Sequence, residues 1–399
     1  MIFQKNYSTT KFTMFLLIFA VAISWSQPFG YLTQIKGNVW FCFSLFFILA
    51  RHLLFYSKVN VNSIFMVLIF FISTLSLGTF KESLIFLKSF SLILLSSLTF
   101  CLLKPSRQDC VYIFKYLTIF SYISLACSIL SFVYAYMGGE SSYSFPLLDG
   151  RISYFHIASF SNVWDGNIIR PGFIYDEPGA YSFFLCFVCF GRLLLNMDNK
   201  HSFFILFLGC ITLSVMHFIV LVSFVLISLT SRQRGVAILL ISSFLIFYFV
   251  SGQVFLDHLL DRFSLSSEAM FDNNRVKQVL SFITLVNEKP EVIYTGYDNL
   301  FGNEKMLWHT YGDMGASPIT PILQFGLMGL IVQFFVFTML LRSFFKKVWV
   351  KNEIFVSLLM CLMLLQRPFY LGAGYSLMVV MVIYMSCLST DSNKAHTRN

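Results

Sequence analysis

The chain has 399 residues, of which 57% are hydrophobic and only 12% carry a charge. Together with a mean hydropathy of +0.75, this composition excludes a soluble globular domain and indicates an integral membrane protein. The net charge of +9 does not call for a nucleic-acid partner. Basic residues in short inner loops set membrane orientation and meet anionic lipid headgroups.

Apolar runs between charged residues mark the expected membrane-spanning segments. A bilayer core about 30 Å thick needs roughly 20 helical residues for each crossing. We therefore expect an all-α, polytopic chain with about twelve transmembrane helices. The expected segments are 12–26, 39–56, 61–79, 83–103, 111–137, 178–196, 202–214, 217–230, 235–253, 318–341, 354–366 and 370–388.

The region 202–230 decides the orientation of every later loop. It is long for one crossing and short for two, and Ser214 and His217 interrupt its middle. Two short crossings place the basic cluster Arg342–Lys351 on the same side as the other basic loops, whereas one crossing would place it outside. We therefore expect two crossings, with His217 packed at the turn between them. Both termini are then cytoplasmic, and two large loops face outward.

These segments divide the chain into five parts. They are 1–137 with five N-terminal transmembrane helices, 138–177 with the first outer loop, 178–253 with the central helices, 254–317 with the second outer loop, and 318–399 with the C-terminal helices and cytoplasmic tail. All nine cysteines fall in spans or on the inner side, so we expect no disulfides. The pair Cys186 and Cys189 has no histidine or second pair nearby and is expected to be buried as small apolar residues.

The first outer loop carries the strongest candidate site. It ends in Arg170-Pro-Gly-Phe-Ile-Tyr-Asp-Glu-Pro-Gly179 and is rich in charged and aromatic residues. Pro178 suits the first turn of the next helix, where Asp176 and Glu177 complement the positive helix end, so capping alone is one interpretation of Asp176. Capping needs no arginine. Arg170 therefore either pairs with one of these carboxylates or binds an anion.

The second outer loop contains a predicted amphipathic helix over about 274–287, which could lie on the membrane surface. Its apolar positions are Val276, Val279, Leu280 and Ile283. Arg275 falls in the first turn, where a cation is unfavourable unless an anion binds there. Planar guanidinium groups suit phosphate oxygens, so Arg170 and Arg275 form a candidate diphosphate clamp, with Arg151 and Arg367 in reserve.

With these features the chain resembles the Wzy-type O-antigen polymerases, within the superfamily that also includes O-antigen ligases. The resemblance rests on the many-span layout with two large outer loops. The motifs that carry it are Arg170–Gly179, Asn274-Arg275, Gly296-Tyr-Asp298 and Leu323-Gln-Phe-Gly-Leu-Met-Gly329.

The resemblance implies a glycosyltransferase in the bacterial inner membrane that joins undecaprenyl-diphosphate-linked oligosaccharides at the periplasmic face. It implies no metal and no other cofactor. Its other partners would be the lipid bilayer, a chain-length regulator and a flippase. Arg170, Arg275 and Arg151 would contact the diphosphate, and Glu177 or His309 would accept the proton of the acceptor hydroxyl.

Two alternatives stay open. Ligase relatives place a histidine shortly before the helix that corresponds to 318–341, but here that neighbourhood reads Gly315-Ala-Ser-Pro318 and His309 is offset. This difference favours a polymerase over a ligase. A lipid-linked oligosaccharide flippase or transporter would also have many spans. Transporters bind substrate near the membrane midplane, whereas the polar residues here concentrate in the two outer loops.

Overall fold

The computed structural model describes most of the helical part of the chain. It covers residues 7–23, 26, 37–56, 85–146, 152–164, 168–175, 177–230, 233–236, 238–239, 241–242, 274–297, 310–311, 319–345, 350–367, 370 and 372–396. The described structure is mostly helical. The expected segment 61–79 lies outside the described residues and 235–253 lies largely outside them. Each of the other expected segments coincides with a helix.

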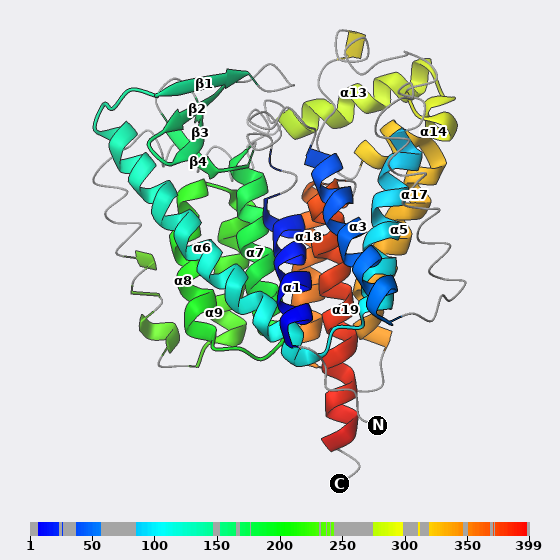
Figure 1. Cartoon of the computed structure of the whole chain (residues 1–399). Coiled ribbons are helices and arrows are strands. Elements are labelled where there is room, and N and C mark those ends of the chain that lie inside the picture. Colours follow the sequence, from blue (N-terminus) through cyan, green and yellow to red (C-terminus); the bar gives the residue numbers. More distant parts are fainter. Residues whose placement is uncertain are drawn as a thin grey trace.

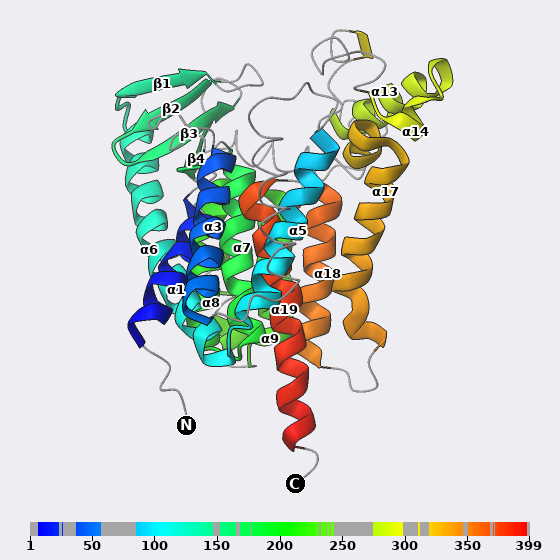
Figure 2. The same cartoon turned by 45° about the vertical axis from the view of Figure 1, so that its right-hand side comes forward.

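The long helices stand side by side in one bundle (Figures 1 and 2). They are α1 (Tyr7–Ala22), α3 (Gly37–Tyr56), α5 (Ile85–Leu103), α6 (Arg107–Tyr136), α7 (Pro178–Leu194), α8 (Asn199–Gly209), α9 (Val215–Ser228), α17 (Thr320–Leu341), α18 (Lys351–Gln366) and α19 (Ala373–His396). Both chain termini lie at one end of the bundle, and a small β-sheet and helix α13 (Asn274–Glu288) lie at the other (Figure 1). We call the end with the sheet and α13 the upper face. The two expected outer loops therefore share one face.

Two helices in the described ranges are long and apolar enough to cross a membrane. They are α6 and the segment Thr320–Phe345, in which α17 continues into the 3-10 turn η3 (Arg342–Phe345). Their lengths and composition point to a membrane protein. The count of about twelve crossings stays a prediction.

The polarity of α6 is inverted relative to a helix in a soluble protein. Small polar side chains face the bundle and are buried, namely Ser121, Ser124, Ser128 and Ser131. Large apolar side chains on the same helix are exposed, namely Tyr112, Tyr116, Ile119, Ile123 and Leu130. Small residues let helices approach closely inside a bilayer, where lipid rather than water surrounds the outer surface. This distribution is the one expected for a helix that faces lipid.

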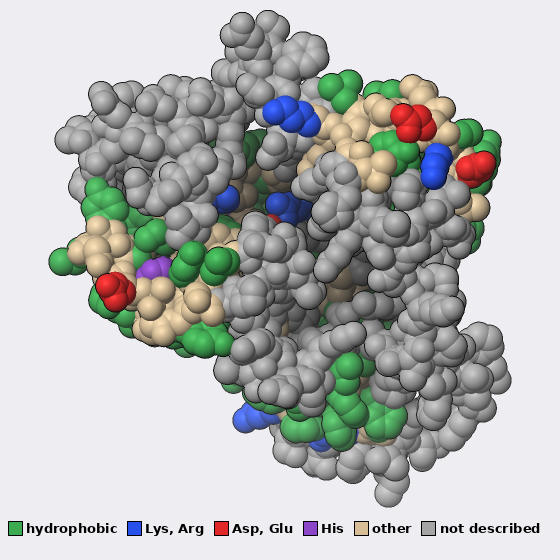
Figure 3. All heavy atoms as spheres, turned by 90° about the horizontal axis from the view of Figure 1, so that it is seen from above, with side chains coloured by type: hydrophobic (Ala, Val, Ile, Leu, Met, Phe, Trp, Pro, Cys, Tyr) green, Lys and Arg blue, Asp and Glu red, His purple; other side chains and the backbone are tan. Residues whose placement is uncertain are grey.

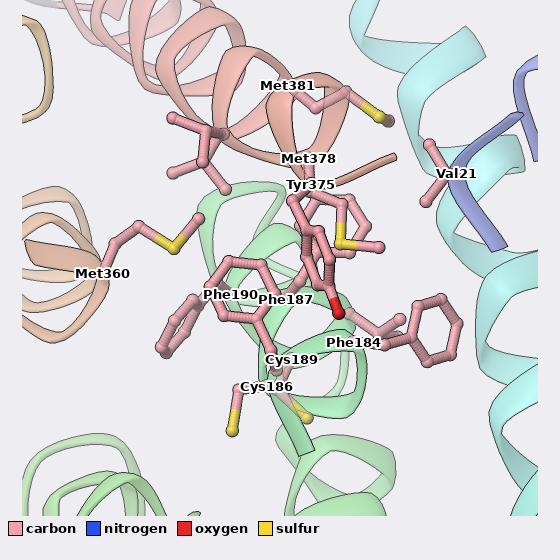
Figure 4. Close-up of a cluster of buried hydrophobic side chains, with 14 of the residues drawn as sticks. Val21, Phe184, Cys186, Phe187, Cys189, Phe190, Met360, Tyr375, Met378 and Met381 are labelled. Carbon is pink, nitrogen blue, oxygen red and sulfur yellow. The ribbon is translucent and has the colours of Figure 1, made fainter. Parts of the chain in front are cut away.

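Helix α7 forms the centre of the bundle. Nearly all of its side chains are buried, as expected for a helix that is apolar on every side. Its aromatic residues lie among side chains of α18 and α19 (Figure 4). Cys186 and Cys189 belong to this core, as predicted, and all nine cysteines are free in the structure. The expectation that no histidine lies near the pair is wrong, because Cys186 Sγ is 3.5 Å from Nδ1 of His217, which is distant in sequence.

A buried arginine fixes the lower end of α7. Arg192 donates hydrogen bonds to Thr118 Oγ1 of α6 at 2.9 Å, Ser202 Oγ of α8 at 3.1 Å and the Asp198 carbonyl oxygen at 2.7 Å. A buried charge is tolerated only when its donors are satisfied. These contacts tie three helices together at the end opposite the sheet.

The first outer loop is not helical, and here the expectation of an all-α chain is wrong. It folds into a four-stranded antiparallel sheet in the order β1-β2-β3-β4. The strands are β1 (Tyr143–Pro146), β2 (Ile152–His156), β3 (Ser159–Trp164) and β4 (Ile168–Phe173). Pro146 and Pro171 lie in the two outermost strands. The strands are short and contain serines, so they lack the regular apolar alternation that predicts a strand.

The sheet is joined to the upper part of α6 at its β2–β3 turn. Ser131 Oγ donates to the His156 carbonyl oxygen at 2.5 Å and accepts from Ala158 N–H at 3.3 Å. Ser159 Oγ accepts from Phe173 N–H at 3.0 Å, which ties β3 to the end of β4. The sheet therefore connects the upper end of α6 to the start of α7 (Pro178–Leu194).

The region 202–230 forms two short antiparallel helices, as predicted. A 3-10 turn, η2 (Cys210–Thr212), follows α8, and Leu213 has a left-handed backbone with φ of 53°. His217 is fully buried: its Nε2 lies 2.8 Å from the Leu206 carbonyl oxygen and its Nδ1 lies 3.1 Å from Ser182 Oγ. The predicted packed histidine is confirmed, and it ties the α8–α9 turn to α7.

The amphipathic helix of the second loop is also confirmed as α13. Its Val279, Leu280 and Ile283 are exposed, whereas Leu285 is buried against α14 (Val292–Thr295) and α17. The predicted apolar stripe therefore faces away from the bundle. The prediction that it rests on the membrane surface is untested.

The predicted orientation can be tested by chemical labelling. In spheroplasts, a membrane-impermeant maleimide should modify Ser144→Cys, which is exposed in β1, without permeabilisation. It should modify Lys200→Cys, exposed at the start of α8, only after permeabilisation. The wild-type chain controls for native cysteines. The reverse pattern would invert the proposed topology.

The sheet should loosen in acid. His156 is buried with Nδ1 2.8 Å from Ser161 Oγ, and burial lowers the pKa of its imidazole. Because the pKa is lower in the folded than in the unfolded chain, stability should be lost as the pH falls below the usual histidine pKa of about 6.5. The protection factors of the amides in 152–164, which are corrected for the pH dependence of intrinsic exchange, should therefore fall between pH 7.5 and 5. This fall should be absent in His156→Gln, and an unchanged pH response of the protection factors in that variant would contradict this assignment.

Candidate functional site

The candidate site lies at the upper face, where β4 leads into α7. β4 ends at Phe173, which has φ of 55°, and the Tyr175 N–H donates to the Gly172 carbonyl oxygen at 2.9 Å. A Cβ on Gly172 would lie 3.0 Å from the Tyr175 carbonyl oxygen, closer than ordinary van der Waals contact, so a side chain there would crowd the turn. Pro178 then begins α7. The Arg170–Gly179 motif is thus a tight turn from strand to helix.

Two tyrosines hold this turn against the bundle. Tyr175 is buried, and its hydroxyl donates to the Ala22 carbonyl oxygen at the end of α1 at 3.1 Å. Its ring stacks on Tyr181 of α7, with centroids 5.7 Å apart. The Tyr181 hydroxyl lies 2.8 Å from Ser124 Oγ of α6. Tyr175 is therefore tied directly to α1 and α7, and through Tyr181 to α6.

Glu177 is the N-cap residue of α7, but its side chain makes no capping hydrogen bond. Instead its carboxylate forms an ion pair with Arg367, the C-cap residue of α18. The Glu177 side chain is 8% exposed and that of Arg367 is 38% exposed. Each charge also complements the dipole of its own helix, since an anion suits an N-terminus and a cation a C-terminus. The pair joins the upper ends of two antiparallel helices.

Arg170 contacts the end of a third helical segment. Its Nε donates to the Thr212 carbonyl oxygen at 3.2 Å and its Nη2 to the Leu213 carbonyl oxygen at 3.3 Å. Carbonyls at the end of a helix lack intrahelical partners and attract a cation. Arg170 therefore has a structural role between β4 and the α8–α9 turn, in addition to any role in binding.

The upper face is hollowed between the sheet and the part of the chain that carries α13. Seen from above, Lys or Arg side chains are visible on the floor of this hollow (Figure 3). The upper ends of α7 and α18, with Glu177 and Arg367, belong to this end of the bundle. Cationic groups thus occupy a recess at the end of an apolar bundle.

The structure describes some of the predicted site residues but not others. Arg170 and Glu177 are described in full, and both lie at the β4–α7 junction. Arg275 is the second residue of α13 on the same face. Arg151 and His309 lie outside the described residues, so neither the third predicted diphosphate contact nor the second predicted base is tested, and the same holds for Asp176.

Sequence reasoning missed the partner of Glu177. Arg367 follows the apolar segment of α18 and was expected on the outer side, but no spacing relates it to Glu177. The only signal was complementary charge at the outer ends of two predicted spans. The hydrogen bonds of Arg170 to backbone carbonyls were also not predicted, because they depend on how close the turn between α8 and α9 lies to β4.

Among the described residues, the guanidinium groups of Arg170 and Arg367 could bind an anion, and the carboxylate of Glu177 could accept a proton. The half-exposed guanidinium of Arg367 can exchange its contact with Glu177 for phosphate oxygens, which suit a planar donor fork. Glu177 would then be released to accept a hydroxyl proton. Within the described ranges, no group of three or more His, Cys, Asp or Glu side chains is placed to hold a metal ion.

Comparison of the chain with protein-family models, curated proteins and solved structures gives no match. The family resemblance inferred from the motifs therefore stays a prediction.

The Glu177–Arg367 pair should be energetically coupled. Glu177→Gln and Arg367→Gln should each lower the thermal stability of the purified protein, and the double variant should lose less than the sum of the two. We expect a coupling of about 1 kcal/mol, because one partner is partly exposed to solvent. Glu177→Gln combined with Lys200→Gln provides the additive control. Additive losses in the first pair would show that the ion pair is not formed.

Proposed function

We propose that this chain is a membrane glycosyltransferase that polymerises a surface polysaccharide from lipid-diphosphate-linked oligosaccharide units, such as O-antigen repeats. The observation that carries the proposal is the ion pair of Glu177 and Arg367 at the upper face of an apolar bundle, with Arg170 on the strand that leads into the same helix. If that face is outward, these groups would lie at the end of the apolar bundle, near the headgroups where the diphosphate of a membrane lipid is found. The family resemblance, which rests in part on the same Arg170–Gly179 motif, predicts the same reaction.

In the proposed reaction an acceptor sugar hydroxyl attacks the anomeric carbon of the donor glycan. The bond from that carbon to the diphosphate oxygen breaks, and the lipid diphosphate leaves with the electron pair. The hydroxyl proton passes to a carboxylate or imidazole, for which Glu177 and His309 are the candidates. Arg170, Arg275 and Arg367 stabilise the charge that develops on the leaving diphosphate.

The ion pair suggests how the base is kept inactive until substrate binds. Glu177 is largely covered and faces Arg367, so it has to lose this partner before it can accept a proton. A diphosphate that draws Arg367 toward its own oxygens would release the carboxylate in the same step. The energy of glycosyl transfer comes from the donor's diphosphate linkage, so no nucleotide is required.

Arginine replacements test the proposed clamp. In vesicles that contain the purified protein and a lipid-diphosphate-linked repeat, Arg170→Ala, Arg275→Ala and Arg367→Ala should each slow chain extension by about a hundred-fold. The matched control is Arg107→Ala at the lower face, because Arg107 also donates to a helix-end carbonyl, that of Leu195, at 3.1 Å. This control should extend chains at nearly the wild-type rate. Lysine at 170 or 367 should restore activity only in part.

Normal chain extension in all three alanine variants, with insertion and thermal stability intact, would refute the clamp. A strain that lacks the chain separates the polymerase from its alternatives. A single repeat on the lipid core supports the polymerase. Polymer that accumulates on its lipid carrier indicates a ligase, and lipid-linked single repeats trapped on the cytoplasmic side indicate a flippase.

A further inference from the structure

Two of the sequence motifs that the reaction does not use meet each other in the fold. Gly296 follows α14 in the second outer loop, and Gly326 lies inside α17. Both have left-handed backbones, with φ of 75° and 58° respectively. Such angles are readily adopted only by glycine. At Gly326 the backbone leaves helical geometry altogether, so α17 is broken there into two helical pieces.

Each glycine lies against the backbone of the segment that contains the other glycine. A Cβ on Gly296 would lie 2.5 Å from the Gln324 carbonyl oxygen, and a Cβ on Gly326 would clash with the Tyr294 carbonyl. The Tyr297 N–H donates to the Leu323 carbonyl oxygen at 2.8 Å, which closes the contact with a hydrogen bond. We call this contact the glycine clasp. Because backbone atoms oppose each glycine, rotation of a side chain cannot make room for a methyl group.

The clasp is the base of a small apolar cluster that holds α13. Leu285 of α13, Val292 of α14, Tyr297 and Leu323 are buried together, separately from the main core of the bundle. Tyr311 packs against this cluster, and its hydroxyl donates to Glu288 at the end of α13 at 2.7 Å. The described part of α13 thus reaches the bundle mainly through α14 and the broken end of α17.

We infer that Gly296 and Gly326 are positioning residues, which fix α13 to α17 and thereby set where Arg275 stands above the upper face. Arg275 is the second residue of α13 and precedes Val292, the first residue of α14, by 17 positions (292 − 275). A helix is stiff, so a small displacement at α14 moves its far end through a larger arc. The clasp itself does not depend on the proposed reaction, whereas its effect through Arg275 rests on that proposal.

Hydrogen exchange of the purified protein in lipid nanodiscs tests the clasp directly. In the wild type, the Tyr297 amide should be protected. Gly296→Ala and Gly326→Ala should each accelerate exchange in 285–297 by about ten-fold or more, since local opening requires less free energy once the contact is strained. Exchange in α7 should not change. Gly235→Ala is the matched control, because a Cβ there meets nothing within 4 Å.

A double-mutant cycle tests action through Arg275. If the clasp works by placing this arginine, Gly296→Ala combined with Arg275→Ala should extend chains no more slowly than Arg275→Ala alone. Losses that multiply would overturn the positioning role. An unprotected Tyr297 amide in the wild type, or unchanged exchange in both glycine variants, would overturn the clasp. A wild-type protein that extends no chains would refute the proposed function, while the exchange data would still decide the clasp.

Discussion

The burial of α7 constrains every other part of the structure. A helix covered on all sides can shift neither along its axis nor about it without losing contacts with α6, α18 and α19 at once. Its lower end is fixed by the hydrogen bonds of Arg192, and its upper end begins at Pro178 directly after the Arg170–Gly179 turn. The position of Glu177 along the axis of α7 is therefore set by the packing of the whole helix, including its lower end. The packing of α7 therefore helps to hold Glu177 in place at the upper face.

The helical segments could be predicted because hydrophobic length and charge are local properties of a sequence. The split of 202–230 followed from charge balance, and His217 was correctly expected at the turn. The sheet could not be found in this way, since its strands are short and its buried face is formed by serines and His156 rather than by a regular apolar alternation. The sheet packs instead against α6, and a contact between segments distant in sequence leaves no local sequence pattern.

Within the candidate site, the residue types were predictable but their partners were not. Arg170 and Glu177 stood out because a cation and two carboxylates come immediately before a long apolar run. The pairing of Glu177 with Arg367 and of Arg170 with the Thr212 carbonyl depends on how far each helix extends toward the upper face. The glycine clasp shows the same limit. Gly296 and Gly326 were each noted, but only the fold brings their two backbones together.

The prolines of the sheet have a further consequence. Pro146 lies in β1 and Pro171 in β4, the two outermost strands. A proline has no N–H to offer to an additional strand, so it interrupts the row of backbone donors along an open edge. Edge strands without such interruption tend to pair with neighbouring molecules. The prolines thus discourage the addition of a further strand at these two positions of the sheet.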